Sequence, residues 1–354
     1  MKQRLDELHS LTEGIGRPMK IMEVCGTHTV EIFRHGIRDV IPKSITLLSG
    51  PGCPVCVTSV RDVDAAIVIA KVPGVILATF GDMMRVPGGK QSMLEARSEG
   101  ADIRVLYSPI DALALAQKEK EREVVFFATG FETTSPLIAG TIAHAEQAGI
   151  KNFTVYTAHK LVPPALKALL DSSDVQVDGF ILPGHVSTII GKTPYEFVAG
   201  QYKKPSVITG FEAKEIIEGI LMIVRQIAQQ RTSVEIQYAS VVKEEGNPRA
   251  IALLHNYFLP DDAYWRGIGV IPQSGLRLRD KYASFDANIK FKPPLSDGKE
   301  PELCSCGDIL RGVKIPTECP LFGTACTPEA PVGPCMVSTE GSCAAYYKYG
   351  NYHG

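Results

Sequence analysis

The stretch ITLLSGPGCPVC at residues 45–56 shows the pattern that decides the fold, an apolar run that ends in a loop of glycine, proline and cysteine. Residues 45–48 are mainly apolar, with Leu47 and Leu48 adjacent rather than alternating with polar residues, as in parallel strands that helices cover on both faces. The glycines at positions 50 and 52 let the backbone turn sharply and approach a ligand closely. Cys53 and Cys56 form a C-x-x-C pair, which can change between dithiol and disulfide or bind a soft metal.

Similar apolar runs recur over about the first 290 residues and predict strands that alternate with helices. The expected strands are residues 21–24, 45–48, 66–70, 75–80, 103–106, 124–128, 153–157, 179–182, 207–209 and 276–278. The expected helices are residues 110–121, 136–148, 163–170, 213–230 and 249–258. Ten strands are too many for one sheet of usual size. We therefore predict an α/β protein with two α/β domains, each with a mainly parallel sheet, and a small C-terminal cysteine-rich segment.

The domain boundaries follow from where these patterns change. We place the first α/β domain at residues 1–135, the second at residues 136–290 and the cysteine-rich segment at residues 291–354. The first boundary is approximate, and the chain is free to cross between the domains. The tetrapeptide TGFE follows an apolar run at residues 129–132 and again at residues 209–212. This repeated tetrapeptide suggests that the chain consists of two related halves.

The overall composition argues against two classes of partner. The chain has 354 residues, 45% of them hydrophobic and 21% charged, and a net charge of -2. So small a charge, without a basic cluster, favours neither nucleic acid nor an anionic membrane surface. The most apolar region, residues 65–80, is interrupted by Lys71, Pro73 and Gly74 and cannot cross a bilayer. The first 20 residues lack the apolar stretch of a secretory signal, so we expect a cytoplasmic protein.

Nine cysteines in a reducing compartment indicate metal binding or redox chemistry rather than structural disulfides. Cys25 directly follows the first expected strand, and His28 comes three residues later. Alone, each is typical of an inert buried or loop residue. Together they could supply a thiolate and an imidazole to iron, or a thiolate and its proton acceptor. Asp82 and His185 also follow strands, and such loops meet at the carboxyl edge of a sheet, where ligands bind.

The tail differs from the rest of the chain because six cysteines lie within residues 301–346, where apolar runs are few. Iron–sulfur clusters select thiolate ligands, and four of them would hold a [4Fe–4S] cluster. The spacing leaves the ligand set open between Cys304, Cys319, Cys326 and Cys343, a series that begins at Cys306 instead, and the use of Cys335. A structural zinc site and free thiols are the alternatives, although zinc sites prefer shorter knuckle spacings.

Several long and unusual motifs of this chain resemble the signature loops of the hydrogenase maturation factor family HypD. They are CGTHT at residues 25–29, GPGCPVC at 50–56, FGDMMRVPG at 80–88, GFETT at 130–134 and PGHVS at 183–187, followed by CPLFG at 319–323, PCMVS at 334–338 and EGSC at 340–343. The matches run in order over almost the whole chain, and no signature cysteine is missing.

The resemblance implies a tail that carries a [4Fe–4S] cluster and a complex with the small chaperone HypC. In that complex one iron would be held while two cyanides, which come from the partner HypE, and one carbon monoxide are attached. Cys25 would bridge the iron and face a cysteine of HypC, with His28 assisting. Cys53 and Cys56 would act as a redox pair or as further iron ligands. Glu132, in the GFETT loop, is a further site candidate beside Asp82 and His185.

These observations support a maturation scaffold with redox activity rather than a conventional turnover enzyme. Transfer of cyanide from a thiocyanate-like carrier consumes two electrons, and a dithiol that closes to a disulfide releases two. A freestanding iron–sulfur thiol–disulfide reductase is the alternative function, because it would use the same Cys53–Cys56 pair and the same tail. A tail that binds zinc and serves only for docking is the third possibility.

Overall fold

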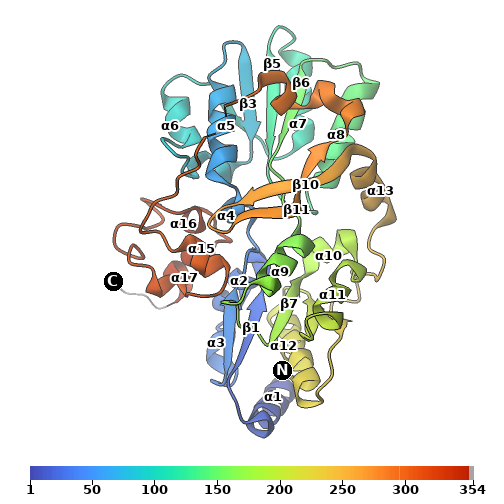
Figure 1. Ribbon diagram of the computed structural model, residues 1–354, viewed down its shortest axis with the longest axis vertical. Coiled ribbons are helices and arrows are strands. Elements are labelled where there is room, and N and C mark those ends of the chain that lie inside the picture. The colour runs from blue at the N-terminus through green and yellow to red at the C-terminus, as the bar shows by residue number, and fades with distance from the viewer. Residues whose placement is uncertain (295, 351–354) are drawn as a thin grey trace.

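The computed structural model describes residues 1–294 and 296–350 of the chain. Within these residues the strands form two parallel sheets and one antiparallel hairpin, and helices pack around them (Figure 1). The tail lies at one side of the molecule (Figure 1), and its cysteines line one cavity there. The predicted α/β class with mainly parallel sheets and a cysteine-rich end is therefore confirmed. Residues 295 and 351–354 of the expected tail segment lie outside the described residues.

The first parallel sheet has the strand order β2-β1-β7-β8-β9. Its strands are β1 (Met19–Glu23), β2 (Ile45–Ser49), β7 (Gly179–Pro183), β8 (Ser206–Thr209) and β9 (Val234–Ile236). On one side the helices α1 (Lys2–Ile15) and α12 (Ala213–Ala228) pack together and bury apolar side chains such as Leu8 and Ile216 against the sheet. The sheet is buried on its apolar faces, as its continuous apolar runs predict.

The second parallel sheet has the strand order β4-β3-β5-β6. Its strands are β3 (Val75–Thr79), β4 (Ile103–Val105), β5 (Glu123–Ala128) and β6 (Phe153–Thr157). The two central strands, β3 and β5, consist almost entirely of buried residues. The two copies of the TGFE tetrapeptide follow β5 in this sheet and β8 in the first sheet, so the repeat marks corresponding positions in the two sheets.

The chain crosses between the two sheets, and this corrects the expected domain division. Residues 19–49 and 179–236 build the first sheet, whereas residues 75–157 between them build the second. The expected division at residue 135 falls inside the second sheet's segment, between β5 and β6. The physical reason is that β7 pairs with β1, with Ile21 opposite Gly179, and so returns the chain to the sheet where it began.

A hairpin of two antiparallel strands, β10 (Phe258–Trp265) and β11 (Gly269–Leu278), lies between the two parallel sheets in Figure 1. The expected strand at residues 276–278 is the end of β11. Trp265 is buried and stacks against Phe131 of the loop after β5, with ring centroids 6.1 Å apart. The hairpin thus closes the space at the carboxyl ends of the strands.

The five expected helices are confirmed, with ends that differ by a few residues. Besides α1, the body contains helices that the sequence did not predict. They are α2 (Gly26–Arg34), α3 (Ile37–Val40), α4 (Pro54–Val57), α5 (Val60–Ala70), α6 (Met93–Ser98), α10 (Gly184–Ile190), α11 (Glu196–Gly200) and α14 (Ala287–Phe291). The five predicted ones are α7 (Pro109–Lys118), α8 (Ser135–Gln147), α9 (Val162–Asp171), α12 and α13 (Pro248–Tyr257). Short 3-10 helices occur at η1 (Gly81–Arg85), η2 (Thr193–Tyr195), η3 (Asp280–Phe285) and η4 (Pro316–Glu318).

One strand prediction is wrong, because residues 66–70 form the second half of helix α5. A short apolar run has the same appearance in a buried strand and in a buried helix. The helix is favoured by Ser59, whose side chain accepts a hydrogen bond from the backbone N–H of Asp62 and so caps the first turn.

The cysteine-rich tail forms three short helices, α15 (Cys306–Leu310), α16 (Pro334–Val337) and α17 (Ser342–Tyr349), which lie beside the first sheet (Figure 1). Helix α17 packs on α2 and α16 packs on α4, so the tail contacts the two helices that begin at the Cys25 and Cys53 loops. Within residues 1–294 and 296–350, no helix combines the length and the apolar character that crossing a bilayer requires.

Replacement by alanine should have opposite effects on stability at two helical glycines. A Cβ added to Gly219 of α12 would overlap the side chain of Thr209 on β8, whereas one added to Gly140 of α8 would meet nothing within 4 Å. We expect Gly219→Ala to lower the free energy of unfolding by roughly 1–3 kcal/mol through overpacking. We expect the control Gly140→Ala to raise it by up to about 1 kcal/mol, because alanine is the better helix former. Urea denaturation measures both, and a stable Gly219→Ala variant would contradict the tight packing of α12 on β8.

Candidate functional site

Cys25 stands at the carboxyl end of β1, where it forms the N-cap of helix α2. The backbone N–H of Gly26 donates a hydrogen bond to the Gly52 carbonyl oxygen, with 2.9 Å between the atoms. A Cβ added to Gly52 would overlap the Cys25 backbone, so the two loops are in direct main-chain contact. The structure therefore brings Cys25 next to the loop that carries Cys53.

Cys53 and Cys56 are joined as a disulfide, with 5.3 Å between their Cα atoms. Cys53 is the N-cap of the short helix α4, and its sulfur accepts a hydrogen bond from the Cys56 N–H at 3.2 Å. The exposed fraction of Cys53 is 4% and that of Cys56 is 0%. On its other side the Cys56 sulfur lies 4.0 Å from the carbonyl oxygen of Pro334, so this redox-capable pair faces the tail.

The Cys25 thiol is almost buried, with 7% of the residue exposed. Burial and the negative charge of Glu340 raise the pKa of Cys25 to about 12. The thiol therefore keeps its proton at neutral pH. A metal ion that binds there must displace the proton, because thiolate is the ligand form.

Glu23 and Thr29 form a buried polar pair beneath the Cys25 loop. The Thr29 hydroxyl donates to Glu23 Oε1, with 2.7 Å between the oxygens. Glu23 is fully buried, and this burial raises the pKa of its carboxyl to about 8. This pair connects β1 to α2 on either side of Cys25.

His28 and His185 belong to one column of stacked rings. Phe211, in the loop after β8, lies between them, with ring centroids 4.7 Å from His28 and 3.9 Å from His185. His28 Nε2 lies 2.9 Å from both the Gly210 carbonyl oxygen and the Thr209 hydroxyl. Burial lowers the pKa of His28 to about 4, so the ring is neutral at physiological pH. His185, at the other end of the column, is exposed.

Asp82 and Glu132 both follow strands of the second sheet, but they differ in their contacts. Asp82, in η1 after β3, lies 3.5 Å from the Ser338 hydroxyl and so contacts the tail. Glu132 is buried, accepts a hydrogen bond from the Val162 N–H at 3.0 Å and has a pKa that burial raises to about 7. Burial raises the pKa of the Tyr195 hydroxyl, and Glu132 and Cys25 add to this effect.

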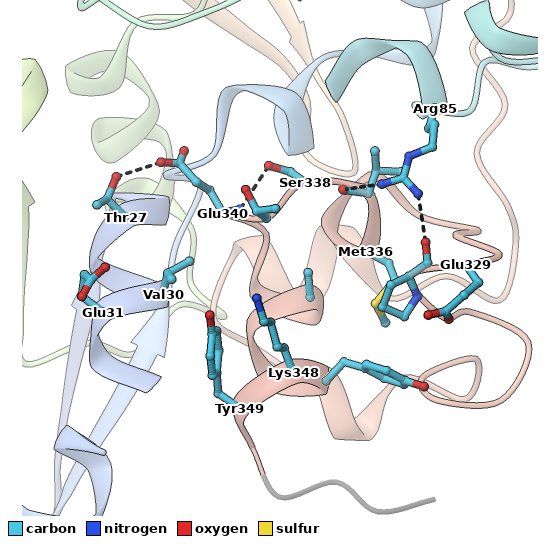
Figure 2. A pocket seen from close by; sticks show the side chains of 15 residues that line it. Thr27, Val30, Glu31, Arg85, Glu329, Met336, Ser338, Glu340, Lys348 and Tyr349 are labelled. Carbon is cyan, nitrogen blue, oxygen red and sulfur yellow. Dashed lines mark hydrogen bonds between the residues drawn. The ribbon is translucent and has the colours of Figure 1, made fainter. Parts of the chain in front are cut away.

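Glu340 connects the tail to the Cys25 loop, a contact that the sequence did not predict. The Thr27 hydroxyl donates to Glu340 Oε1, with 2.8 Å between the oxygens (Figure 2). A surface hollow beside this contact is lined by residues from α2, η1 and the tail, among them Thr27, Glu31, Arg85, Glu329, Glu340 and Lys348. Glu340 stands in the EGSC motif, but a single glutamate between cysteines gives no spacing signal for such a contact.

All six tail cysteines line one small cavity whose other walls are mainly apolar. Cys306 and Cys335 are paired within it, with 3.0 Å between their sulfurs. The two thiols share a hydrogen bond, and this bond together with the positive charge of Arg266 lowers the pKa of Cys306. These two cysteines are the alternates of the sequence prediction, and Cys335 also contacts Cys343.

The remaining cysteines, Cys304, Cys319, Cys326 and Cys343, form a set of four thiols around the same cavity. Burial, together with the neighbouring cysteines, raises the pKa of both Cys304 and Cys326. Among the described residues, no three His, Cys, Asp or Glu side chains are arranged to hold one metal ion. Four thiols around an apolar cavity fit a cluster, which is wider than a single ion and takes one thiolate at each iron.

One segment of main chain lies between this cavity and the Cys53–Cys56 disulfide. Residues 333–335 pass between the two, because a Cβ on Gly333 would contact the Cys304 sulfur and the Pro334 carbonyl oxygen contacts Cys56. The Cys306–Cys335 pair continues this segment on the cavity side. The same short segment therefore contacts both the disulfide and the cavity that the tail cysteines line.

Comparison with known proteins gives one consistent result. A family model described as "HypD: Hydrogenase formation hypA family" matches residues 1–350. The hydrogenase maturation factor HypD of Azotobacter vinelandii is 49% identical over 341 residues, which cover 94% of this chain and 90% of that protein. HypD2 of Bradyrhizobium diazoefficiens is 48% identical over 344 residues (95% and 90%), and HypD of Rhodobacter capsulatus is 47% identical over 358 residues (99% and 95%).

The buried carboxyl of Glu23 makes stability depend on pH. Between 4.5, the ordinary pKa, and about 8, the folded protein holds a proton that the unfolded chain has lost. Stability therefore falls as the pH rises through this window, and Glu23→Gln should make the fall less steep. Urea denaturation at a series of pH values measures the slope.

The control for this prediction is Glu95→Gln. The Ser92 cap lowers the pKa of Glu95, so this carboxylate is ionised in both states throughout the same window. Its replacement should leave the slope unchanged. Equal slopes for the wild type and Glu23→Gln would contradict the view of Glu23 as a buried neutral acid.

Proposed function

We propose that this chain, which belongs to the HypD family of hydrogenase maturation factors, is the scaffold on which the Fe(CN)2CO centre of nickel–iron hydrogenases is assembled. The cargo iron is held between Cys25 and a cysteine of the small partner HypC. Cyanide arrives from the partner HypE, and carbon monoxide completes the ligand set. The reducing cytoplasm, in which free thiols persist, is the compartment that suits this chemistry.

The observation that carries the proposal is the main-chain contact between the Cys25 loop and the Gly52–Cys53 loop. It places one free thiol beside a redox-capable pair at the carboxyl edge of a parallel sheet, the position where open α/β sheets bind ligands. Thiolate is a soft donor that suits low-spin iron. Because Cys25 keeps its proton when alone, iron that binds there releases that proton.

The neighbouring cysteines supply the electrons that cyanide transfer consumes. When a cyano group leaves a thiocyanate sulfur for iron, two electrons are needed to give an iron-bound cyanide and a free thiolate. Reduced Cys53 and Cys56 release two electrons and two protons as they close to the disulfide. In the tail, Cys304, Cys319, Cys326 and Cys343 would hold a [4Fe–4S] cluster, which transfers single electrons when bound. The support for this assignment is that the close contact of Cys306 with Cys335 leaves four further cysteines around the same cavity.

Burial of the disulfide favours the scaffold over a freestanding thiol–disulfide reductase. Cys56 is fully buried and Cys53 is almost so, whereas an enzyme that reduces other proteins must expose its attacking sulfur. The two functions differ in a simple assay, since a reductase would reduce an added disulfide substrate without HypC. We expect no such turnover from the chain alone.

The first test is the loss of iron loading in Cys25→Ala. Infrared spectra of the complex co-purified with HypC should show cyanide and carbonyl stretching bands for the wild type and none for this variant. Val24→Ala, which trims the buried neighbour, is the control for local packing and should keep the bands. Normal bands in Cys25→Ala would refute the role of this thiol, and their absence from the wild-type complex would refute the scaffold itself.

The second test separates the four cluster ligands from the thiol pair. Alanine at Cys304 or Cys343 should abolish the visible absorbance and the bound iron and sulfide of the tail, because each removes one of four ligands. Alanine at Cys306 or Cys335 should leave all three intact. Iron and sulfide analysis measures the outcome, and loss of the cluster in Cys306→Ala with retention in Cys304→Ala would reverse the assignment.

A further inference from the structure

A short segment of the tail passes over the Cys25 loop, and we call residues 338–341 the strap. It connects helix α16, which carries Cys335, to helix α17, which carries Cys343. The strap therefore belongs to the sulfur-rich tail in sequence, but its contacts are with the loops that follow β1 and β3. Figure 2 shows Ser338, Glu340 and Thr27 along one side of the surface hollow.

Glu340 makes the closest contacts of the strap. Its carboxylate accepts the hydrogen bond from the Thr27 hydroxyl at 2.8 Å. Its Cβ and carbonyl oxygen lie against Gly26, where an added Cβ would come within 2.6 and 2.7 Å of them. Gly26 is the residue directly after Cys25, so the strap rests on the first turn of α2. A side chain at this position would push the strap away.

The rest of the strap is held independently of the Glu340 carboxylate. The Ser338 hydroxyl accepts a hydrogen bond from the Glu340 N–H at 3.2 Å and lies 3.5 Å from Asp82 Oδ2. Just before the strap, the Arg85 guanidinium donates to the carbonyl oxygens of Pro328 and Val337, at 3.1 and 3.4 Å. The hydrogen bond from Thr27 to Glu340 thus joins the strap to the Cys25 loop itself, while these other anchors hold the strap to η1.

We propose that Glu340 is a positioning residue that holds the strap over Cys25. Its hydrogen bond with Thr27, which we call the latch, must break before the Cys25 sulfur is accessible to iron. The inference rests on the proposed function only for the identity of the cargo. The strap contacts Gly26, the residue next to Cys25, and the Cys25 thiol is almost buried. The latch ties access to Cys25 to the tail, because the strap begins and ends at helices that carry tail cysteines.

The experiment measures how fast iodoacetamide labels Cys25 in the purified full-length chain, by mass spectrometry of the Cys25 peptide. We expect Glu340→Ala to speed this labelling about tenfold, since a hydrogen bond to a charged group no longer keeps the strap closed. Thr27→Val removes the same bond from the other side and should have the same effect. Thr27→Ser keeps the hydroxyl and should label as slowly as the wild type.

Two further sets of variants separate the latch from a simple effect of charge. Glu340→Gln removes the charge but keeps an oxygen that accepts from Thr27, so the latch predicts slow labelling. Glu31 and Glu329 line the same hollow, and the Glu31 carboxylate pairs with Arg34 rather than with Thr27. Alanine at either position should therefore leave the labelling rate at the wild-type value. Fast labelling of Glu340→Gln would mean that charge alone controls the thiol, and the latch would be refuted.

The remaining outcomes also decide the matter. Wild-type labelling rates in both Glu340→Ala and Thr27→Val would overturn the proposal. Faster labelling of the tail cysteines together with Cys25 would also overturn it, because it would indicate that the variants loosen the whole tail rather than release the strap. Labelling needs neither iron nor cyanide. Failure of the latch therefore leaves the infrared test of the scaffold untouched, and failure of the scaffold leaves the labelling result valid.

Discussion

The close approach of two main-chain loops is the constraint on which the rest of the structure depends. The hydrogen bond from the Gly26 N–H to the Gly52 carbonyl oxygen joins the loop after β1 to the loop after β2. Only glycine at position 52 leaves room for the Cys25 backbone. Because β1 and β2 are parallel neighbours, their carboxyl ends are already side by side. The contact fixes the position of the Cys25 loop, which carries a free thiol, relative to the loop that carries the redox-capable pair.

Burial then decides the chemistry of the groups around this contact. Cys25, Glu23 and His28 are all buried, and loss of hydration favours the neutral form of an ionisable group. Burial raises the pKa of Cys25 and Glu23 and lowers that of His28, so all three are neutral when the protein is alone. Under the proposed function, a neutral interior of this kind suits a cargo ion that brings its own charge.

The tail depends on the body for its own arrangement. It has few apolar residues of its own, yet its cysteines share one buried cluster with Val24, Trp265 and the Cys53–Cys56 pair. The turn of the hairpin fits closely on it, because a Cβ on Gly267 would overlap the Gly307 backbone. The tail is thus part of the same packed unit, and this is why a sulfur-rich end can lie against a site built by residues far away in the sequence.

The sequence alone determined the α/β class, nine of the ten expected strands, the glycine-rich loops after them and the cysteines that carry the chemistry. These features are local, since strand periodicity, turn residues and thiol count can be read within short windows. The exception is residues 66–70, where a buried helix and a buried strand have the same apolar pattern. Only the tertiary structure decided that the chain returns to its first sheet at β7, that Cys306 pairs with Cys335, and that Glu340 reaches Thr27. Each of these joins residues from separate segments, and which segments meet depends on packing over the whole chain rather than on any single stretch of it.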